Sequence, residues 1–157
     1  MPQEITMTAD DMAALHARAF DQDRAWRAAE FSDLLRSPFV QAHTHTYGFA
    51  LTRTVAGEAE LLTLAVDPRH QRQGIARALL SRWLNDAAEI AQTAFLEVAT
   101  DNTGAIALYL DLGFVTIASR AAYYARKNGT VADALILQRP LPHSHGADSI
   151  PFPSESS

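Results

Sequence analysis

A basic loop with one glycine, followed at once by a helical pattern, is the feature of this chain best suited to holding an anion. It lies within Val66–Leu80, where an apolar strand pattern ends at Asp67 and a helix is predicted from Ile75. The first turn of a helix exposes backbone N–H groups at the positive end of its dipole, and these groups bind phosphate. We therefore expect the amides of Arg72 to Arg77, with Gly74 among them, to bind a phosphate-bearing ligand. An ordinary strand-to-helix turn with solvated arginines is the alternative.

A carboxylate in the middle of an apolar strand pattern is the second candidate for chemistry. Glu97 lies between Leu96 and Val98, where burial without a partner is costly. Strand alternation places it with Phe95 and Ala99 on a face that we expect to line a cleft, although a strand with one solvated side is the commoner explanation. In a cleft, Glu97 could act as a general base, directly or through a water.

A helix predicted to begin near Asn102 and to end at Gly113 carries the third candidate, Tyr109. A buried phenol either packs in the core or donates a proton to a departing group such as a thiolate. Asn102 either caps the helix or hydrogen-bonds a ligand. With the phosphate-binding loop and Glu97, these residues predict a cofactor-dependent group transfer.

The apolar periodicities predict the elements that must position these residues, in the order β-α-α-β-β-β-α-β-α-β-β. Thr8 is expected to start the first helix, and Ile75, Leu79, Trp83, Ala87 and Ile90 form one buried stripe on a later one. The expected strands are 3–7, 39–44, 47–55, 59–66, 94–99, 114–119 and 131–137, and the later helices are 27–36, 75–91 and the one that ends at Gly113. Residues 1–139 form one expected domain, and the Pro- and Ser-rich tail 140–157 is expected to be irregular.

Composition excludes several classes of protein. The chain has 157 residues, no cysteine and a formal net charge of −5, which favours a reducing compartment and argues against general nucleic-acid binding. No apolar run approaches the ~20 residues that span a bilayer, and the N-terminus lacks a signal-peptide pattern. We therefore expect a cytoplasmic protein without membrane contact. His43 and His45 share a strand face, but no third metal ligand is evident. We therefore expect no bound metal ion, and we expect both histidines to be solvated.

The motifs together resemble one family. Leu61–Pro68, Gln71–Ala76, Leu96–Val98, Asn102 and Ala105–Phe114 are similar, in sequence and in order, to the GNAT acetyltransferases. Among these they look most like the RimI-like branch, the ribosomal-protein alanine N-acetyltransferases. The resemblance implies the GNAT fold, which is α/β (α+β in strict usage), with three α/β/α layers around a mixed, mostly antiparallel sheet of six to seven strands.

The resemblance also implies a role for each site residue, with acetyl-CoA as the cosubstrate. Glu97 would be the general base and Tyr109 the general acid that protonates the CoA thiolate. The backbone partners of the pantetheine arm would be Leu64, Ala65 and Val66. The pyrophosphate would lie against Arg72, Gln73, Gly74, Ile75, Ala76 and Arg77, with Asn102 further along the cofactor. The acceptor would contact Trp26, Tyr123 and Tyr124.

Departures from the family pattern fall mostly on the acceptor side. Ala99 follows the Leu-Glu-Val motif where a basic residue is frequent, Ala125 replaces a proline, and Arg120 is what remains of a basic pair. The expected acceptor is the N-terminal α-amine, with alanine first, of a protein such as a ribosomal protein. A small amine, an antibiotic or a lysine side chain is the alternative acceptor, and a non-catalytic CoA-binding module is the alternative class. The sequence leaves the oligomeric state open.

Overall fold

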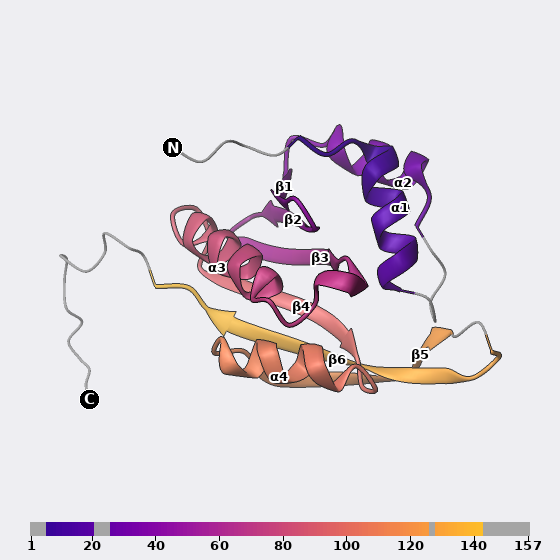
Figure 1. Cartoon of the computed structure of the whole chain (residues 1–157). Coiled ribbons are helices and arrows are strands. Elements are labelled where there is room, and N and C mark those ends of the chain that lie inside the picture. Colours follow the sequence, from indigo (N-terminus) through magenta and orange to yellow (C-terminus); the bar gives the residue numbers. More distant parts are fainter. Residues whose placement is uncertain (1–5, 21–25, 126–127, 143–157) are drawn as a thin grey trace, which may run out of the picture.

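The computed structural model describes residues 6–20, 26–125 and 128–142, and Figure 1 shows their arrangement. Its elements, in chain order, are α1 (Ala9–Ala19), α2 (Ala28–Leu35), β1 (Val40–His45), β2 (Gly48–Val55), β3 (Glu58–Val66), the short 3-10 helix η1 (Pro68–His70), α3 (Ile75–Ala87), β4 (Thr93–Ala99), α4 (Thr103–Asp111), β5 (Val115–Ala125) and β6 (Val131–Pro140). From α1 onward this is the predicted order.

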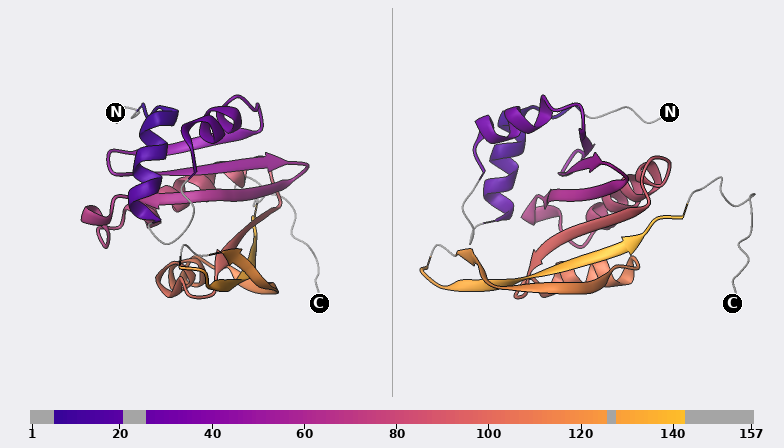
Figure 2. Two further views of the ribbon diagram at one scale, coloured as in Figure 1. Left: turned by 90° about the vertical axis from the view of Figure 1, so that its right-hand side faces the viewer. Right: turned by 180° about the vertical axis from the view of Figure 1, so that it is seen from behind.

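The six strands within the described residues form one sheet in the order β1-β2-β3-β4-β6-β5. Every neighbouring pair is antiparallel except β3 and β4, which are parallel. The predicted mixed, mostly antiparallel sheet is therefore confirmed, with six strands. Figure 2 shows β5 and β6 lying with α4 on one side of the molecule, away from β1 and β2.

The parallel pair separates halfway along its length. Pairing between β3 and β4 stops after Leu61 and Leu96, although both strands continue. At that point β3 contains an extra residue, Leu62, opposite the step from Leu51 to Thr52 in β2. Because a β-bulge bends the strand that carries it, β3 turns away from β4, and the two strands diverge in Figure 1. Since β3 leads into α3 and β4 into α4, both helices begin at the opening.

Two apolar clusters on opposite faces of the sheet complete the three layers. One cluster joins α3 and α4 to the sheet and contains Leu64, Val66 and Leu96. The other joins α1 and α2 to the sheet and contains Phe49 and Ala65. Because neighbours on a strand point to opposite faces, Ala65 faces α1 while Leu64 and Val66 face α3.

Local signals set the ends of the helices as predicted. Thr8 and Asp11 form a reciprocal capping box at the start of α1. The side chain of Asn102 accepts a hydrogen bond from the amide of Ala105 at the start of α4. Gly113, just beyond α4, has a φ of 97°, a left-handed conformation that glycine adopts without steric cost.

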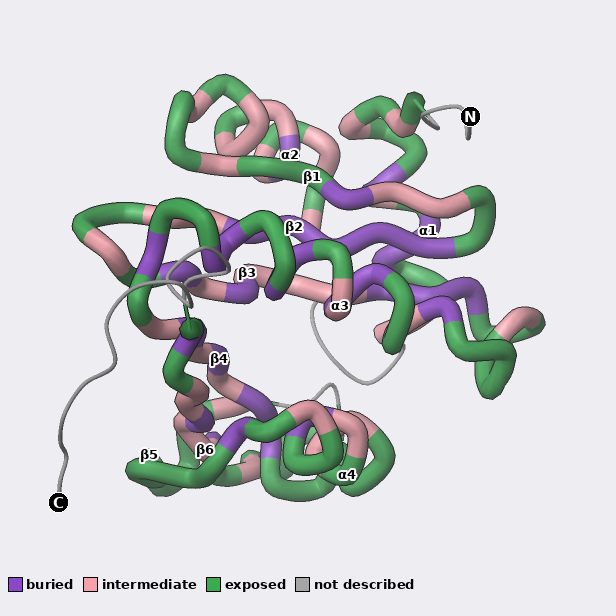
Figure 3. Tube along the Cα trace, turned by 90° about the vertical axis from the view of Figure 1, so that its left-hand side faces the viewer, coloured by how far each residue is buried: buried purple, intermediate pink, exposed green. Residues whose placement is uncertain are grey.

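Several predicted boundaries differ from the structure. Residues 3–5 of the first expected strand lie outside the described residues, and positions 6 and 7 are not in a strand. Helix α3 ends at Ala87 rather than at residue 91, because the chain turns there toward β4, so Ile90 is exposed and the predicted stripe loses its last member. Strand β5 is much longer than predicted and is exposed along almost its whole length (Figure 3). Leu141 is buried in the core and donates its N–H to Gln92 O, two residues beyond the predicted domain boundary at 139.

The prediction that His43 is solvated was wrong. Helix α3 packs against this part of the sheet, and the His43 ring is buried with its Nδ1 3.9 Å from the carboxylate of Asp86. Burial lowers the pKa of His43, Asp86 opposes that shift, and Arg82 adds to it. His45, on the same face, instead lies against the ring of Tyr47.

No helix in the part of the chain that the structure describes is long and apolar enough to cross a membrane. In the same residues, no three His, Asp or Glu side chains gather closely enough to hold a metal ion.

Candidate active site

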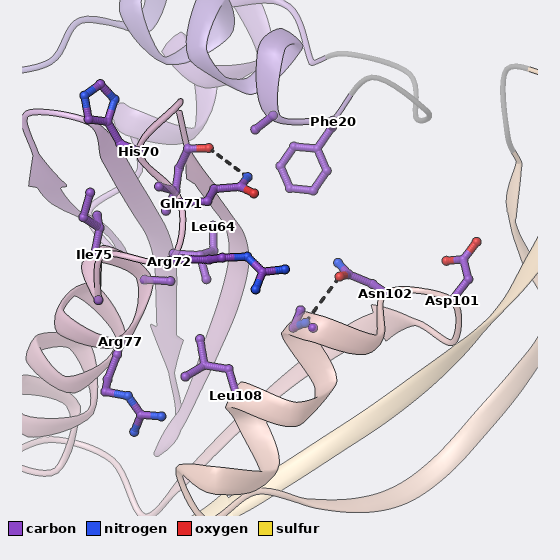
Figure 4. Close-up of a pocket in the computed structure, with 16 residues that line it drawn as sticks. Phe20, Leu64, His70, Gln71, Arg72, Ile75, Arg77, Asp101, Asn102 and Leu108 are labelled. Carbon is purple, nitrogen blue, oxygen red and sulfur yellow. Dashed lines mark hydrogen bonds between the residues drawn. The ribbon is translucent and has the colours of Figure 1, made fainter. Parts of the chain in front are cut away.

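A hollow of about 850 Å³ lies where β3 and β4 diverge. It is lined by four parts of the chain, namely the end of α1, the end of β3, the loop and first turn of α3, and the first turns of α4 (Figure 4). Of the residues predicted to bind the cofactor, it contains Leu64, Val66, Arg72, Gly74, Ile75, Ala76, Arg77 and Asn102. Ala65 and Gln73 do not line it, because Ala65 faces the α1 layer and the Gln73 side chain points to solvent.

The start of α3 is a ready anion site. Gly74 precedes the helix with a φ of 81°, and Arg72 is also left-handed, with a φ of 66°. The first amide to bond back along the helix is that of Ala78, to Gly74 O. The N–H groups of the preceding turn have no carbonyl within the helix to reach. Successive amides in such a turn form a concave site for an anion.

The four arginines of the loop before α3 and of α3 itself differ in their partners. Arg69 is paired with Asp67, Arg77 with Asp111 at 2.7 Å, and Arg82 donates to Thr44 O at 2.8 Å. Within the described residues no ion pair is recorded for the remaining one, Arg72. In Figure 4 the Arg72 side chain lies between the loop and Asn102, so it is the arginine best placed to contact a bound phosphate.

Asp67 holds the loop between β3 and α3 in place. Its carboxylate accepts from the amide and guanidinium of Arg69 and lies 3.3 Å from Arg18 of α1. The hydrogen bonds from Arg69 and the charges of Arg69 and Arg18 lower the pKa of Asp67 to about 2, against a smaller opposing effect of desolvation. The loop is therefore tied to α1 as well as to β3.

The backbone edge of β3 beyond the bulge continues from the anion site toward the interior. From Leu62 to Val66, no strand among the described residues pairs with the edge of β3 that faces β4. Free N–H and C=O groups on a strand edge pair with other extended amide-containing chains. This edge can bind the amide-bearing arm of an elongated ligand whose phosphate lies at the start of α3.

A second pocket of about 480 Å³ contains the two residues predicted to be catalytic, Glu97 and Tyr109. It shares Phe20, Leu64, Asn102 and Ala105 with the first hollow, so the two are contiguous. Two predicted acceptor residues, Trp26 and Tyr124, also line it, whereas Tyr123 does not. Its remaining lining residues are His16, Leu61, Leu62, Thr63, Val98, Ala99 and Ala125.

Burial favours the neutral phenol of Tyr109. The ring packs edge-on against Phe114 and is 6% exposed. Desolvation raises the pKa of its phenol well above the ordinary value, and Tyr124 adds to that shift. The group therefore stays protonated at neutral pH.

Glu97 points to the face of the sheet opposite α4, because its neighbours Leu96 and Val98 pack in the α3–α4 cluster. Its Oε2 lies 3.2 Å from Nη1 of Arg120, which reaches it from β5. This contact was not predicted from the sequence. No local signal links the two residues, since the pair depends on β6 lying between β4 and β5.

Two other lining residues were not expected. His16 and Phe20 come from the end of α1, where their rings stack with centroids 4.4 Å apart, and His16 also stacks on Trp26 at 5.2 Å. This aromatic group forms part of the wall of the second pocket. Only the packing of α1 over β3 shows that Phe20 faces the site.

The contiguous cleft has the exposed amides at the start of α3 at one end, the open edge of β3 along its length, and Glu97 and Tyr109 at the other end. This is the arrangement expected of a group-transfer site for an elongated cosubstrate. The sequence model of the acetyltransferase (GNAT) family matches residues 7–114. The chain belongs to this family, which confirms the resemblance.

Individual relatives share most of the described region. The chain is 43% identical over 94 residues to the [ribosomal protein bS18]-alanine N-acetyltransferase of Escherichia coli, a match that covers 59% of this chain and 63% of that protein. It is 36% identical over 140 residues to the N-alpha-acetyltransferase RimI of Mycobacterium tuberculosis, covering 81% of this chain and 83% of the relative. In the first match, the chain thus spans just under two thirds of the relative's length.

Solved structures agree on the fold. The crystal structure of the ribosomal-protein-S18-alanine N-acetyltransferase from Escherichia coli superposes with a TM-score of 0.77 at 30% identity, over 90% of this chain and 94% of that one. The predicted fold class is confirmed.

Proposed function

We propose that this protein is an acetyl-CoA-dependent N-acetyltransferase whose acceptor is the N-terminal α-amine of a protein, with alanine as the first residue. Family membership and the named activities of the relatives support the acetyl transfer. The observation that carries the proposal is that Glu97 and Tyr109 share one pocket, contiguous with a separate anion site. The absence of cysteine from the chain favours a reducing, cytoplasmic setting.

Each part of the cleft has a place in binding acetyl-CoA. The amides at the start of α3, with Arg72, hold the pyrophosphate. The open edge of β3 from Leu64 to Val66 pairs with the amides of the pantetheine arm, and Asn102 lies beside that arm. The thioester then lies near the shared boundary of the two pockets, which Leu64 lines, and a backbone N–H on the open edge of β3 polarises its carbonyl.

The transfer is a direct attack. Glu97 takes a proton from the acceptor's ammonium group, directly or through a water, and the free amine attacks the thioester carbon. The new C–N bond forms as the C–S bond breaks, and the phenol of Tyr109 gives its proton to the leaving thiolate. The second proton that the amide nitrogen loses passes through water to the Tyr109 phenolate and restores the acid. No covalent enzyme intermediate is needed, since the amine is itself a competent nucleophile.

The proposal is tested by acetyl-CoA-dependent release of free thiol with a panel of acceptors. The panel holds peptides that begin with Ala, Ser, Gly or Met, an N-terminally blocked peptide with an internal lysine, spermidine and an aminoglycoside. We expect turnover on the peptide that begins with alanine. Turnover confined to spermidine, the aminoglycoside or lysine would keep the acetyl transfer and overturn the acceptor.

Glu97→Gln separates an enzyme from a module that only binds CoA. The amide keeps the shape of the side chain but is a far weaker base, so we expect kcat to fall by about 100-fold or more while the acetyl-CoA Kd stays within about twofold. An unchanged kcat would remove Glu97 from its role. Tight acetyl-CoA binding without turnover on any acceptor would favour a non-catalytic module.

A further inference from the structure

Arg120 lies against the proposed general base, and the sheet register explains how it reaches this place. Arg120 on β5 is opposite Ala134 on β6, and Ala134 is opposite Ala99 on β4. Residues paired across strands point to the same face, so Arg120, Ala99 and Glu97 share the face that the second pocket opens onto. The small side chain of Ala134 lets the arginine cross β6 to Glu97, where the nitrogen-to-oxygen distance is 3.2 Å.

A distortion of β5 supports this placement. Three residues, Ala121 to Tyr123, stand opposite the single residue Asp133 of β6. The middle one, Ala122, has a φ of 51°, and its N–H donates to Asp133 Oδ1 at 2.7 Å. Bulges beside functional sites redirect side chains. Here the bulge separates Arg120, which reaches Glu97, from Tyr124, which lines the pocket.

The Arg120 guanidinium contacts two side chains and is still accessible to a third group. Its carbon lies 5.2 Å from the centre of the Tyr123 ring, within cation–π range, while Nη1 faces Glu97 Oε2. The Arg120 side chain is nevertheless 53% exposed. Because a guanidinium has five N–H donors in a rigid fork, donors remain that can face an acceptor entering beside Glu97.

We propose that Arg120 is the residue that selects α-amines, by donating a hydrogen bond to the carbonyl of the acceptor's first residue. The inference rests on the proposed function. An α-amine has a carbonyl carbon two bonds away, at about 2.5 Å from its nitrogen. When Glu97 receives the amine proton through Oε1, the carbonyl oxygen of the acceptor's first residue comes within reach of the guanidinium that lies on Oε2.

Other amines lack this neighbouring carbonyl. The amine of a lysine side chain, a polyamine or a simple alkylamine has no carbonyl two bonds away, so it leaves the Arg120 donors without a substrate partner. A site arranged to hydrogen-bond a substrate group discriminates strongly against analogues without that group. Arg120 therefore favours aminoacyl acceptors over isolated amines, whatever the first side chain is.

The test removes the Arg120 guanidinium and the acceptor carbonyl separately and together, as in a double-mutant cycle. One acceptor is a short peptide that begins with alanine, and the other replaces its first peptide bond with an (E)-alkene, which removes the carbonyl at constant length. We expect the wild-type kcat/KM to favour the peptide by about 10- to 100-fold. In Arg120→Met this preference falls to within about threefold, chiefly through loss of rate on the peptide, and Arg120→Lys recovers part of it.

Two controls keep the outcome decisive. Arg53→Met removes an arginine paired with Glu60 at 2.9 Å between β2 and β3, with similar exposure (41% against 53%), and we expect it to keep the full preference. An unchanged acetyl-CoA Kd shows that Arg120→Met is folded. Equal losses on both acceptors in Arg120→Met, or a gain on both, would overturn the inference, because Arg120 would then act only through Glu97. Absence of wild-type turnover on the alanine peptide would instead overturn the proposed function.

Discussion

At the scale of single residues, the two proposed catalytic groups of the second pocket lie in different surroundings. Glu97 is partly exposed, and its carboxylate lies 3.2 Å from the guanidinium of Arg120. Tyr109 is buried among apolar side chains, which favours the neutral phenol. The proposed function uses the more exposed of these groups, Glu97, as the base and the buried phenol of Tyr109 as the acid.

Tyr109→Phe tests the acid. Removal of the hydroxyl leaves the packing against Phe114 intact but takes away the proton for the leaving thiolate. We expect kcat to fall by about 100-fold with little change in the acetyl-CoA Kd, measured by steady-state kinetics and calorimetry. Tyr47→Phe is the matched control, since that tyrosine stacks on His70 and lines neither pocket. A Tyr109→Phe enzyme as fast as the wild type would exclude the acid role.

At the scale of elements, the cofactor site depends on how β3, its following loop and α1 are joined. The bulge at Leu62 opens the edge of β3, Gly74 turns the chain into α3, and Asp67 connects the loop to Arg18 on α1. None of these features takes part in the proposed chemical steps. Each fixes the position of backbone groups that do contact the cosubstrate in the proposed function.

The Asp67 connection makes stability depend on acid pH. Its pKa in the folded protein, about 2, lies below the unfolded value near 3.9. Such a group stabilises the fold above about pH 4, and the contribution is lost as the pH falls toward 2. We therefore expect Asp67→Asn to lower the free energy of unfolding at pH 7, with a gap to the wild type that narrows between pH 4 and pH 2 in urea titrations. Asp111→Asn, which removes a 62% exposed carboxylate from its pair with Arg77, is the control. A gap that does not vary with pH would contradict the role of Asp67.

At the scale of the whole molecule, the sheet joins two halves that bear different parts of the site. The anion site lies between the starts of α3 and α4, and the base and its arginine come from β4 and β5. Strand β6 connects them, since it pairs with β4 along its length and with β5 on its other edge. Its last residue, Pro140, is opposite Thr93, and Leu141 closes the core behind it.

Truncation tests where the folded unit ends. We propose that a chain ending at Pro142 keeps the Tm and turnover of the full chain, because it retains Leu141 and its hydrogen bond to Gln92. A chain ending at Gln138 loses about 2 kcal/mol of apolar burial at Leu141, and we expect its Tm to fall by roughly 4–8 °C in calorimetry. A large loss of Tm in the longer chain would show that residues beyond 142 contribute to the fold.

The sequence by itself determined the features that depend on neighbours along the chain. The caps at Thr8 and Asn102, the left-handed glycines at 74 and 113 and the order of elements all follow from residues within a few positions of one another. The motif around Gly74, the strand with Glu97 and the helix with Tyr109 were identified in the same way. Hydrogen bonds and apolar periodicity within one helix or strand suffice to encode them.

Only the tertiary structure decided which of these residues meet. The separation of β3 from β4 depends on one extra residue in the register with β2, and the contact of Arg120 with Glu97 depends on β6 lying between two other strands. The burial of His43 under α3 and the aromatic wall of His16 and Phe20 are likewise set by which face each helix covers. Strand order and register are properties of the assembled sheet, and no local spacing of residues specifies them.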